Sequence, residues 1–128
     1  MSDDDELSAA YWDGARRGVL VLQRCGACAT TRHYPRVMCP RCHSFDVEHV
    51  EHPGEGAVHS WTVAHHAFAA DVAGEVPYTL VTVDLGEGIR ALGRLAPPAV
   101  PAVGLPVRIG FEPGDGGLPR PVFTQAAP

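Results

Sequence analysis

The chain has 128 residues, of which 45% are hydrophobic and 20% are charged, and its formal net charge is −5. This length allows one domain or two very small ones, and the negative charge weighs against a nucleic-acid binder, which needs a basic surface. No apolar run is long enough to span a membrane, and four of the first six residues are acidic, unlike a secretory signal, so we expect a cytoplasmic location.

Residues 7–17 predict a short amphipathic helix. Leu7, Tyr11 and Ala15 recur every four residues on one stripe, with Trp12 beside it. Two interpretations stay open for its aromatic residues. They could dock on the rest of their own domain, or they could anchor the helix on another subunit, because Tyr and Trp are favoured interface residues.

All four cysteines fall in two C-x-x-C pairs that are ten residues apart: Cys25 and Cys28, then Cys39 and Cys42. A two-residue gap lets both thiolates of a tight turn bind one tetrahedral ion, with metal–sulfur bonds of about 2.3 Å. Four thiolates leave no open position for chemistry, so the pattern predicts one structural Zn²⁺ per chain. Disulfides or free thiols are the alternative, and without a secretory signal an oxidised framework is not expected.

The segments around the cysteines predict a zinc ribbon over residues 19–53. A strand over residues 19–22 leads into the first pair, residues 33–38 return to the second pair, and residues 46–52 close the ribbon. His33 and His43 are near enough in sequence to compete as ligands. Because four thiolates are already available, we expect both to be bystanders.

The charges along the chain are unevenly distributed. No acidic residue lies between Asp13 and Asp46, whereas this stretch holds six arginines: Arg16, Arg17, Arg24, Arg32, Arg36 and Arg41. A GC-rich genome favours Arg codons, and arginines can offset the charge of about −2 on a zinc ion held by four thiolates. Alternatively, the guanidinium groups face phosphates or an acidic partner protein.

Residues 54–128 predict a small β barrel. Its five expected strands are separated by a loop over residues 69–76, turns near residues 86–88 and 115–117, and a connection over residues 96–104 that holds three prolines. Five short strands with a long connection between the third and the fourth are typical of an OB-type Greek-key barrel. The expected strands cover residues 58–65, 77–84, 89–95, 105–112 and 121–124.

The sequence offers no catalytic constellation. The cysteines are predicted to bind metal, and the chain has no lysine for a phosphate-binding loop. His65 and His66 are the one tempting pair of bases, but neighbouring residues of a strand point to opposite faces. One of the two could still line a pocket. The sequence therefore predicts a binding or assembly module.

Several motifs in order resemble one family, the zinc-ribbon plus OB-fold proteins that accompany thiolases and were once catalogued as a domain of unknown function. The resemblance covers Leu7 to Phe123, and its motifs are specific in combination. They are Tyr11-Trp12-Asp13-Gly14, the run from Val19 to Cys28, His33-Tyr34-Pro35-Arg36, Cys39-Pro40-Arg41-Cys42, Gly56-x-Val58-x-Ser60-x-Thr62-Val63, Pro77-Tyr78 and Gly104-x-Pro106-Val107.

The resemblance implies a mainly β protein: an N-terminal helix within residues 1–18, a rubredoxin-like zinc ribbon and a C-terminal five-stranded OB barrel. Members of the family are usually non-catalytic partners of thiolase-like enzymes that act on acyl-CoA thioesters, including aldolases of steroid side-chain degradation. Some are fused to or complexed with a MaoC-type enoyl-CoA hydratase. This chain carries no hydratase-sized extension, so such a hydratase would be a separate chain.

The chain departs from the usual knuckle pattern at Ala29 and His43, where zinc knuckles commonly have glycine. This departure concerns the geometry of the turns and leaves the four ligands as they are.

We therefore expect an accessory subunit of a thiolase-superfamily acyl-CoA enzyme, which stabilises its partner and could contact the CoA ester. The residues expected at the partner or CoA contact are Tyr11, Trp12, Arg16, Arg17, Arg36, Arg41 and His65. The strongest rival is a single-stranded nucleic-acid module, since zinc ribbons and OB barrels both do that work. A third hypothesis is an independent enzyme that uses His65 or His66.

Overall fold

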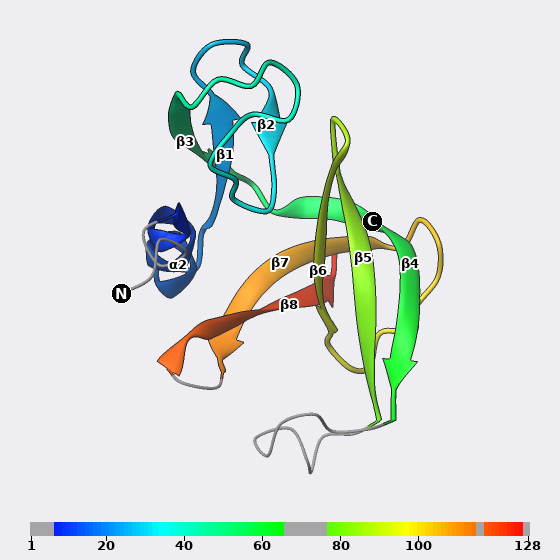
Figure 1. The fold of residues 1–128 in the computed structure, drawn as a ribbon. Helices are drawn as coiled ribbons and strands as arrows, with labels where there is room; N and C mark the ends of the chain where they lie inside the picture. Colours follow the sequence, from blue (N-terminus) through cyan, green and yellow to red (C-terminus); the bar gives the residue numbers. More distant parts are fainter. Residues whose placement is uncertain (1–6, 66–76, 115–116, 127–128) are drawn as a thin grey trace. The chain divides into compact units, whose positions relative to one another are not determined.

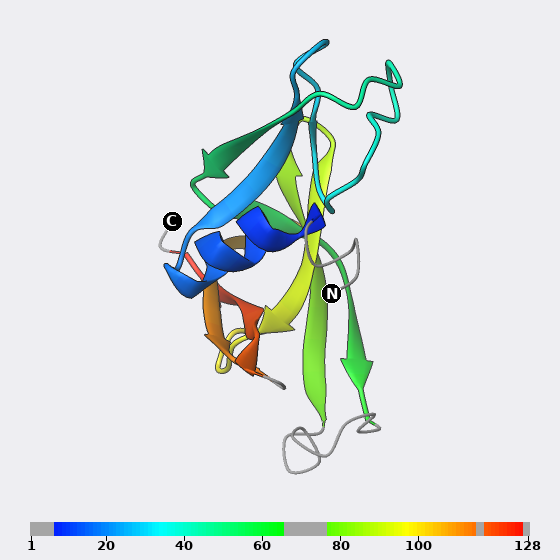
Figure 2. The same ribbon diagram turned by 60° about the vertical axis from the view of Figure 1, so that its left-hand side comes forward.

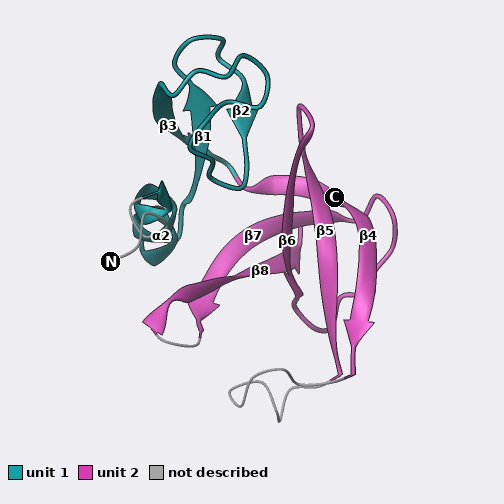
Figure 3. Cartoon of the chain, in the orientation of Figure 1, with its two compact units in different colours: residues 1–53 teal, residues 54–128 magenta. Residues whose placement is uncertain are grey.

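A computed structural model describes residues 7–65, 77–114 and 117–126 of the chain (Figure 1). The chain divides into two compact units, residues 1–53 and residues 54–128, which Figure 3 colours separately. Each unit has its own sheet and its own buried side chains. Among the described residues, no helix has the length and apolar character needed to cross a membrane.

In its described part, the first unit combines helix α2 (Ala9–Arg16) with a three-stranded antiparallel sheet. The sheet has the order β2-β1-β3 and is built from β1 (Leu20–Cys25), β2 (Thr31–Arg32) and β3 (Val47–His52). The central strand β1 pairs with β3 along its whole length but with β2 at only two positions. The first unit is therefore a three-stranded ribbon in which β2 is a short edge strand.

Helix α2 (Ala9–Arg16) packs on β1, as Figure 2 shows. Its buried residues are Tyr11, Gly14 and Ala15, in line with the stripe expected from the sequence. Gly14 is required for this packing because a side chain there would collide with that of Val21. The helix ends before Gly18, whose φ of 76° is a conformation that glycine adopts without strain.

The segment that follows β2 returns to the second cysteine pair, as the sequence predicts. Residues 33–38 return toward the second cysteine pair without forming a strand, and only Thr31 and Arg32 pair with β1. Pro35 has no N–H group for a sheet, and the N–H group of Arg36 donates instead to the side chain of Gln23. The return segment is therefore held by side chains rather than by a strand ladder.

The second unit is a closed five-stranded barrel with the order β4-β5-β6-β8-β7. All neighbouring strands are antiparallel except β6 and β8, which are parallel. This is the strand order of the OB fold, and the five expected strands are confirmed. The strands are β4 (Glu55–Ala64), β5 (Tyr78–Gly86), β6 (Ile89–Leu95), β7 (Pro106–Pro113) and β8 (Pro119–Gln125).

The connection between β6 and β7 contains neither helix nor strand, as its three prolines predict. Of the expected loops, residues 69–76 lie outside the described residues, as do two of the three residues of the turn at 115–117. Strand β4 begins earlier than expected, at Glu55, because its first residues pair with β7 and so close the barrel.

The barrel core is formed by alternate residues of β5 and β6 together with Val58, Val107 and Phe123. Phe123 is fully buried, and its ring lies directly over Gly93. A Cβ atom at Gly93 would be 2.8 Å from that ring, closer than carbon atoms pack. The glycine in β6 thus makes room for the largest side chain of the core.

Candidate metal centre and the surface around it

Each cysteine pair sits in a tight turn with the same backbone hydrogen bonds. In the first turn, the N–H group of Ala29 donates to the carbonyl oxygen of Cys25 at 3.0 Å, and the N–H group of Cys25 donates to that of Thr30 at 2.9 Å. In the second turn, the N–H groups of His43 and Cys39 donate across the turn at 2.9 Å each, to the carbonyl oxygens of Cys39 and Ser44. The two turns are repeats of one knuckle.

The position after each pair is in the left-handed conformation. Ala29 has a φ of 63° and His43 has a φ of 65°. A residue with a Cβ atom is strained in this region, whereas glycine is not. The departure from glycine seen in the sequence therefore leaves the knuckle geometry intact at a cost in strain.

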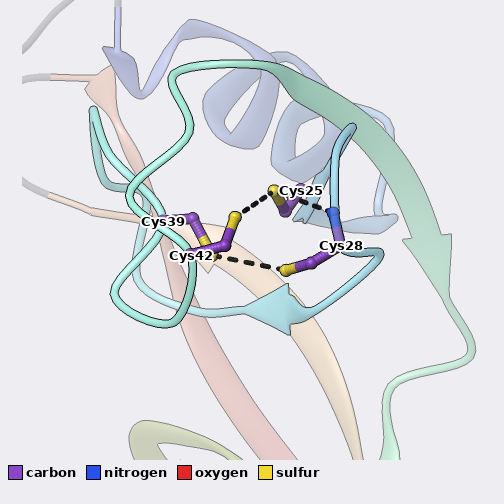
Figure 4. Close-up of side chains that lie close together, drawn as sticks. All are labelled: Cys25, Cys28, Cys39 and Cys42. Atoms are coloured by element: carbon purple, nitrogen blue, oxygen red, sulfur yellow. Dashed lines mark hydrogen bonds between the residues drawn. The ribbon is translucent and has the colours of Figure 1, made fainter.

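The four cysteine sulfur atoms converge on one point (Figure 4). All lie within 4.8 Å of one another, with 3.5 Å between Cys25 Sγ and Cys42 Sγ and 3.7 Å between Cys28 Sγ and Cys39 Sγ. A tetrahedron with metal–sulfur bonds of about 2.3 Å has edges of about 3.8 Å. The four sulfur atoms therefore fit the ligand shell of one tetrahedral ion.

Hydrogen-bond donors around the sulfur atoms favour the thiolate form. The N–H groups of Ala27 and Cys28 both point at Cys25 Sγ, at 3.4 Å each. The hydroxyl group of Thr30, with its backbone N–H group, lowers the pKa of Cys28 to about 6. The backbone N–H group of Cys42 lowers the pKa of Cys39. Such donors are what a metal-binding thiolate needs around it.

Four thiolates this close together repel one another unless a cation lies between them. The N–H group of Ser44 lowers the pKa of Cys42. The neighbouring thiols, Cys25 first, and burial raise this pKa by more than that, so that it reaches about 12. A divalent ion at the centre would remove this conflict, because metal coordination deprotonates a thiol outright. The donor set thus fits a soft or borderline dication.

The site is closed. Cys25 and Cys39 are buried whereas Cys28 and Cys42 are exposed, so each pair has one buried and one exposed cysteine. Sulfur atoms fill all four corners of the tetrahedron, which leaves no position for a substrate or a catalytic water. The arrangement can cross-link the two knuckles and stabilise the small first unit, whose core is otherwise minor.

The histidines of the ribbon lie apart from the sulfur cluster. In the described part of the chain, the only group of three or more side chains placed to hold a metal is the four cysteines. His33 packs against the rings of Tyr11 and Tyr34, at centroid distances of 5.4 Å and 3.9 Å, and burial lowers its pKa to about 4. His43 occupies the left-handed turn position.

The predicted helix anchors differ in their accessibility. Tyr11 is only 8% exposed, and burial raises the pKa of its hydroxyl group to about 12. Its ring meets that of Trp12 edge-on at 4.9 Å. Burial therefore leaves Tyr11 little surface for the partner contact predicted for it. Trp12 is partly exposed, so part of its surface is accessible to a partner.

The six arginines between Asp13 and Asp46 fall into three groups. Arg17 pairs with Asp13 and Glu51, and Arg24 pairs with Glu48. Arg32 is buried. The remaining three are exposed and have no ion-pair partner among the described residues: Arg16, Arg36 and Arg41.

His65 belongs to the other unit. It is exposed and directly follows strand β4. Its neighbour His66 lies outside the described residues. The contact predicted for His65 stays a prediction.

Sequence reasoning missed a set of exposed apolar side chains around the second knuckle. They lie in loops and at the start of β3, where no helical or strand periodicity draws attention to them: Tyr34, Val37, Met38, Phe45 and Val47. The available signal was the number of large apolar residues in a segment too short to bury them.

Two family models match the chain in succession. The ChsH2 rubredoxin-like zinc ribbon domain matches residues 12–48, and the ChsH2 C-terminal OB-fold domain matches residues 49–112. A DUF35 domain-containing scaffold protein of Methanocaldococcus jannaschii is 30% identical over 89% of this chain and 86% of its own length.

Two longer proteins also match. A probable enoyl-CoA hydratase alpha subunit of Thermomonospora curvata is 42% identical over 93% of this chain. The 3-oxo-4,17-pregnadiene-20-carboxyl-CoA hydratase alpha subunit of Mycobacterium tuberculosis is 38% identical over 79% of it. The match covers 38% and 32% of these two relatives, so the chain spans about a third of their length.

Among solved structures, a chain of the Ltp2-ChsH2(DUF35) aldolase superposes with a TM-score of 0.81 and is 38% identical. The superposition covers 99% of this chain and 100% of that one. A DUF35 family protein of unknown function from Sulfolobus solfataricus shares the fold, with a TM-score of 0.61 at 16% identity, over 94% of this chain and 85% of that one.

Proposed function

The chain belongs to the ChsH2 family, a rubredoxin-like zinc ribbon followed by an OB-fold domain, and we propose that it is a non-catalytic accessory subunit of a thiolase-superfamily acyl-CoA enzyme. The partner would be a thiolase or a retro-aldolase of lipid or steroid side-chain catabolism. The observation that carries this proposal is the match to a chain of the Ltp2-ChsH2(DUF35) aldolase, which covers 99% of this chain and 100% of that one.

We propose that the metal is one Zn²⁺ per chain, held by Cys25, Cys28, Cys39 and Cys42. The sulfur–sulfur distances and the absence of an open corner support a structural ion. In this role the ion joins the two knuckles, and the accessory subunit in turn stabilises its enzyme. A direct contact with the CoA ester is part of the proposal, because exposed guanidinium groups suit its phosphates.

A MaoC-type enoyl-CoA hydratase is the second candidate partner. The names of two relatives, both hydratase alpha subunits, favour it. Because those relatives are about two and a half times as long as this chain, the hydratase activity of the whole protein does not transfer to the part that matches.

The test is co-expression of this chain with a thiolase-like protein, and separately with a MaoC-type hydratase, from the same genome. Tagged chain, purified in the presence of zinc, should elute with the thiolase-like protein as one stable complex. Elution with the hydratase alone would replace the first partner by the second. If neither protein co-elutes, and the chain instead binds single-stranded oligonucleotides at micromolar concentration in a salt-sensitive way, the nucleic-acid function holds.

A further inference from the structure

Three large apolar side chains that lie close together in the sequence, around the second knuckle, are exposed. Val37 is 62% exposed, Met38 is 41% exposed and Phe45 is 69% exposed. Val37 and Met38 directly precede Cys39, and Phe45 follows the same turn. The hydrogen bond from the N–H group of Cys39 to the carbonyl oxygen of Ser44 holds the two arms of the turn side by side. We call these three side chains the knuckle patch.

The backbone beneath the knuckle patch is held in place. The N–H group of Arg36 donates to Gln23 Oε1 at 2.8 Å, and its carbonyl oxygen accepts from Arg32 Nη2 at 3.1 Å. Both of these partner side chains are buried, so the residue before Val37 is attached to the core of the first unit. A surface fixed in this way binds a partner without a large cost for ordering itself.

The border of the knuckle patch is cationic. Arg36 precedes the patch and Arg41 lies between the two cysteines of the second knuckle. Both side chains are exposed and without an ion-pair partner among the described residues, whereas Arg17 and Arg24 are paired. One acidic residue, Asp46, directly follows Phe45 in the sequence. The complementary surface is therefore an apolar hollow bordered by carboxylates.

We propose that the second knuckle, through the exposed side chains of the knuckle patch and of Arg36 and Arg41 next to it in sequence, is the surface that docks on the acyl-CoA enzyme subunit. This inference rests on the proposed function and locates its interface. It replaces the buried Tyr11 by Phe45 as the central anchor. An aromatic side chain surrounded by aliphatic contacts and arginines is the usual composition of an interface hot spot.

A protein fits this surface better than a nucleic acid does. Val37 and Met38 offer no flat face on which a base could stack, and the whole chain has a net charge of −5.

The test measures the affinity of the zinc-loaded chain for the co-expressed thiolase-like subunit by calorimetry. Phe45→Ser should weaken binding by about 10- to 100-fold. Met38→Ser should weaken it as well. Arg36→Glu and Arg41→Glu should weaken it several-fold and reduce its dependence on salt. Val100→Ser and Val103→Ser are matched controls, because these barrel residues are 75% and 74% exposed, and both should bind as the wild type does.

The same measurements distinguish a failure of this inference from a failure of the proposed function. If the wild type does not bind the subunit, the proposed function fails. If the wild type binds and the patch variants, with full zinc content, bind as tightly, the inference is overturned and the function stands. Arginine variants that lose zinc more readily at unchanged affinity would show that Arg36 and Arg41 serve the metal centre instead.

Two further results would also overturn the inference. One is a wild-type homodimer in sedimentation that Phe45→Ser dissociates, which would assign the patch to a second copy of this chain. The other is oligonucleotide binding that Phe45→Ser abolishes.

Discussion

The side-chain oxygen of Gln23 accepts a 2.7 Å hydrogen bond from Nε of Arg32, and both side chains are buried. They lie on neighbouring strands, directly opposite each other. No ion pair to Arg32 occurs among the described residues, and its Nη1 atom has no hydrogen-bond partner there. A buried cation in the ribbon is therefore held by a neutral amide and a backbone carbonyl, an arrangement that depends on each of its few contacts.

Gln23→Leu should therefore destabilise the first unit by about 3 kcal/mol, because it removes an acceptor from a buried guanidinium. Urea unfolding of the zinc-loaded chain measures this. In the double variant Gln23→Leu/Arg32→Met the combined loss should be smaller than the sum of the single losses. Gln125→Leu, at an exposed position of the barrel, is the control and should change stability little. Additive losses would show that the two side chains do not act together.

Cys28→Ser should lower the metal content of the purified chain well below one ion and open the first unit, while the barrel stays folded. The ion supplies much of the folding free energy of a ribbon this small. Metal analysis and chelator titration report the first effect, and loss of partner binding should appear before any change in the partner's catalytic constants. Ala27→Ser changes an exposed, non-ligand position of the same knuckle and should keep a full ion. A metal-free chain that is folded and binds its partner would disprove the structural role.

Ala29→Gly and His43→Gly should each stabilise the chain by up to about 1 kcal/mol. Relief of the left-handed strain, about 1–2 kcal/mol, outweighs the extra entropy that glycine gives the unfolded chain. Ala27→Gly is the control in the first knuckle, since Ala27 has no positive φ and should only lose stability. Equal effects at positions 27 and 29 would contradict the strain argument.

Gly93→Ala should destabilise the barrel by about 1–3 kcal/mol, because the new methyl group meets the buried ring of Phe123. Thermal unfolding measures the loss. Gly110→Ala, also in a strand, is a matched control: its new Cβ would have a single neighbour, at 3.9 Å. If the two variants unfold at the same temperature, close packing over Gly93 is not the reason for the glycine.

The neutral, buried His33 should make stability depend on pH between about 4 and 6.5. Its pKa is about 4 in the folded chain, against 6.5 for a histidine in an unfolded chain, so the unfolded state binds more protons in this window. Stability should be complete above pH 6.5 and should fall as the pH approaches 4, by about 3 kcal/mol in all. His33→Phe should lose this contribution. The difference between wild type and variant isolates it from acid release of the metal, which affects both.

Much of the fold could be predicted from local patterns. The C-x-x-C spacing predicted the convergence of the four sulfur atoms, because two knuckle turns and one ten-residue spacer leave few other arrangements. Strand periodicity placed the five barrel strands, and three prolines excluded a helix between β6 and β7. These features depend on the chemistry of residues that are close together in the sequence, so they can be predicted from the sequence alone.

The tertiary structure alone decided what each side chain is available for. Six arginines look alike in the sequence, yet long-range pairing of β1 with β3 neutralises Arg24, pairing with β2 buries Arg32, and Arg36 and Arg41 have no ion-pair partner among the described residues. Tyr11 and Phe45 are both aromatic, but the first faces the core and the second faces solvent. Exposure and ion pairing depend on contacts between residues far apart in the chain. A linear sequence does not contain those contacts, and the candidate interface therefore emerged only from the folded unit.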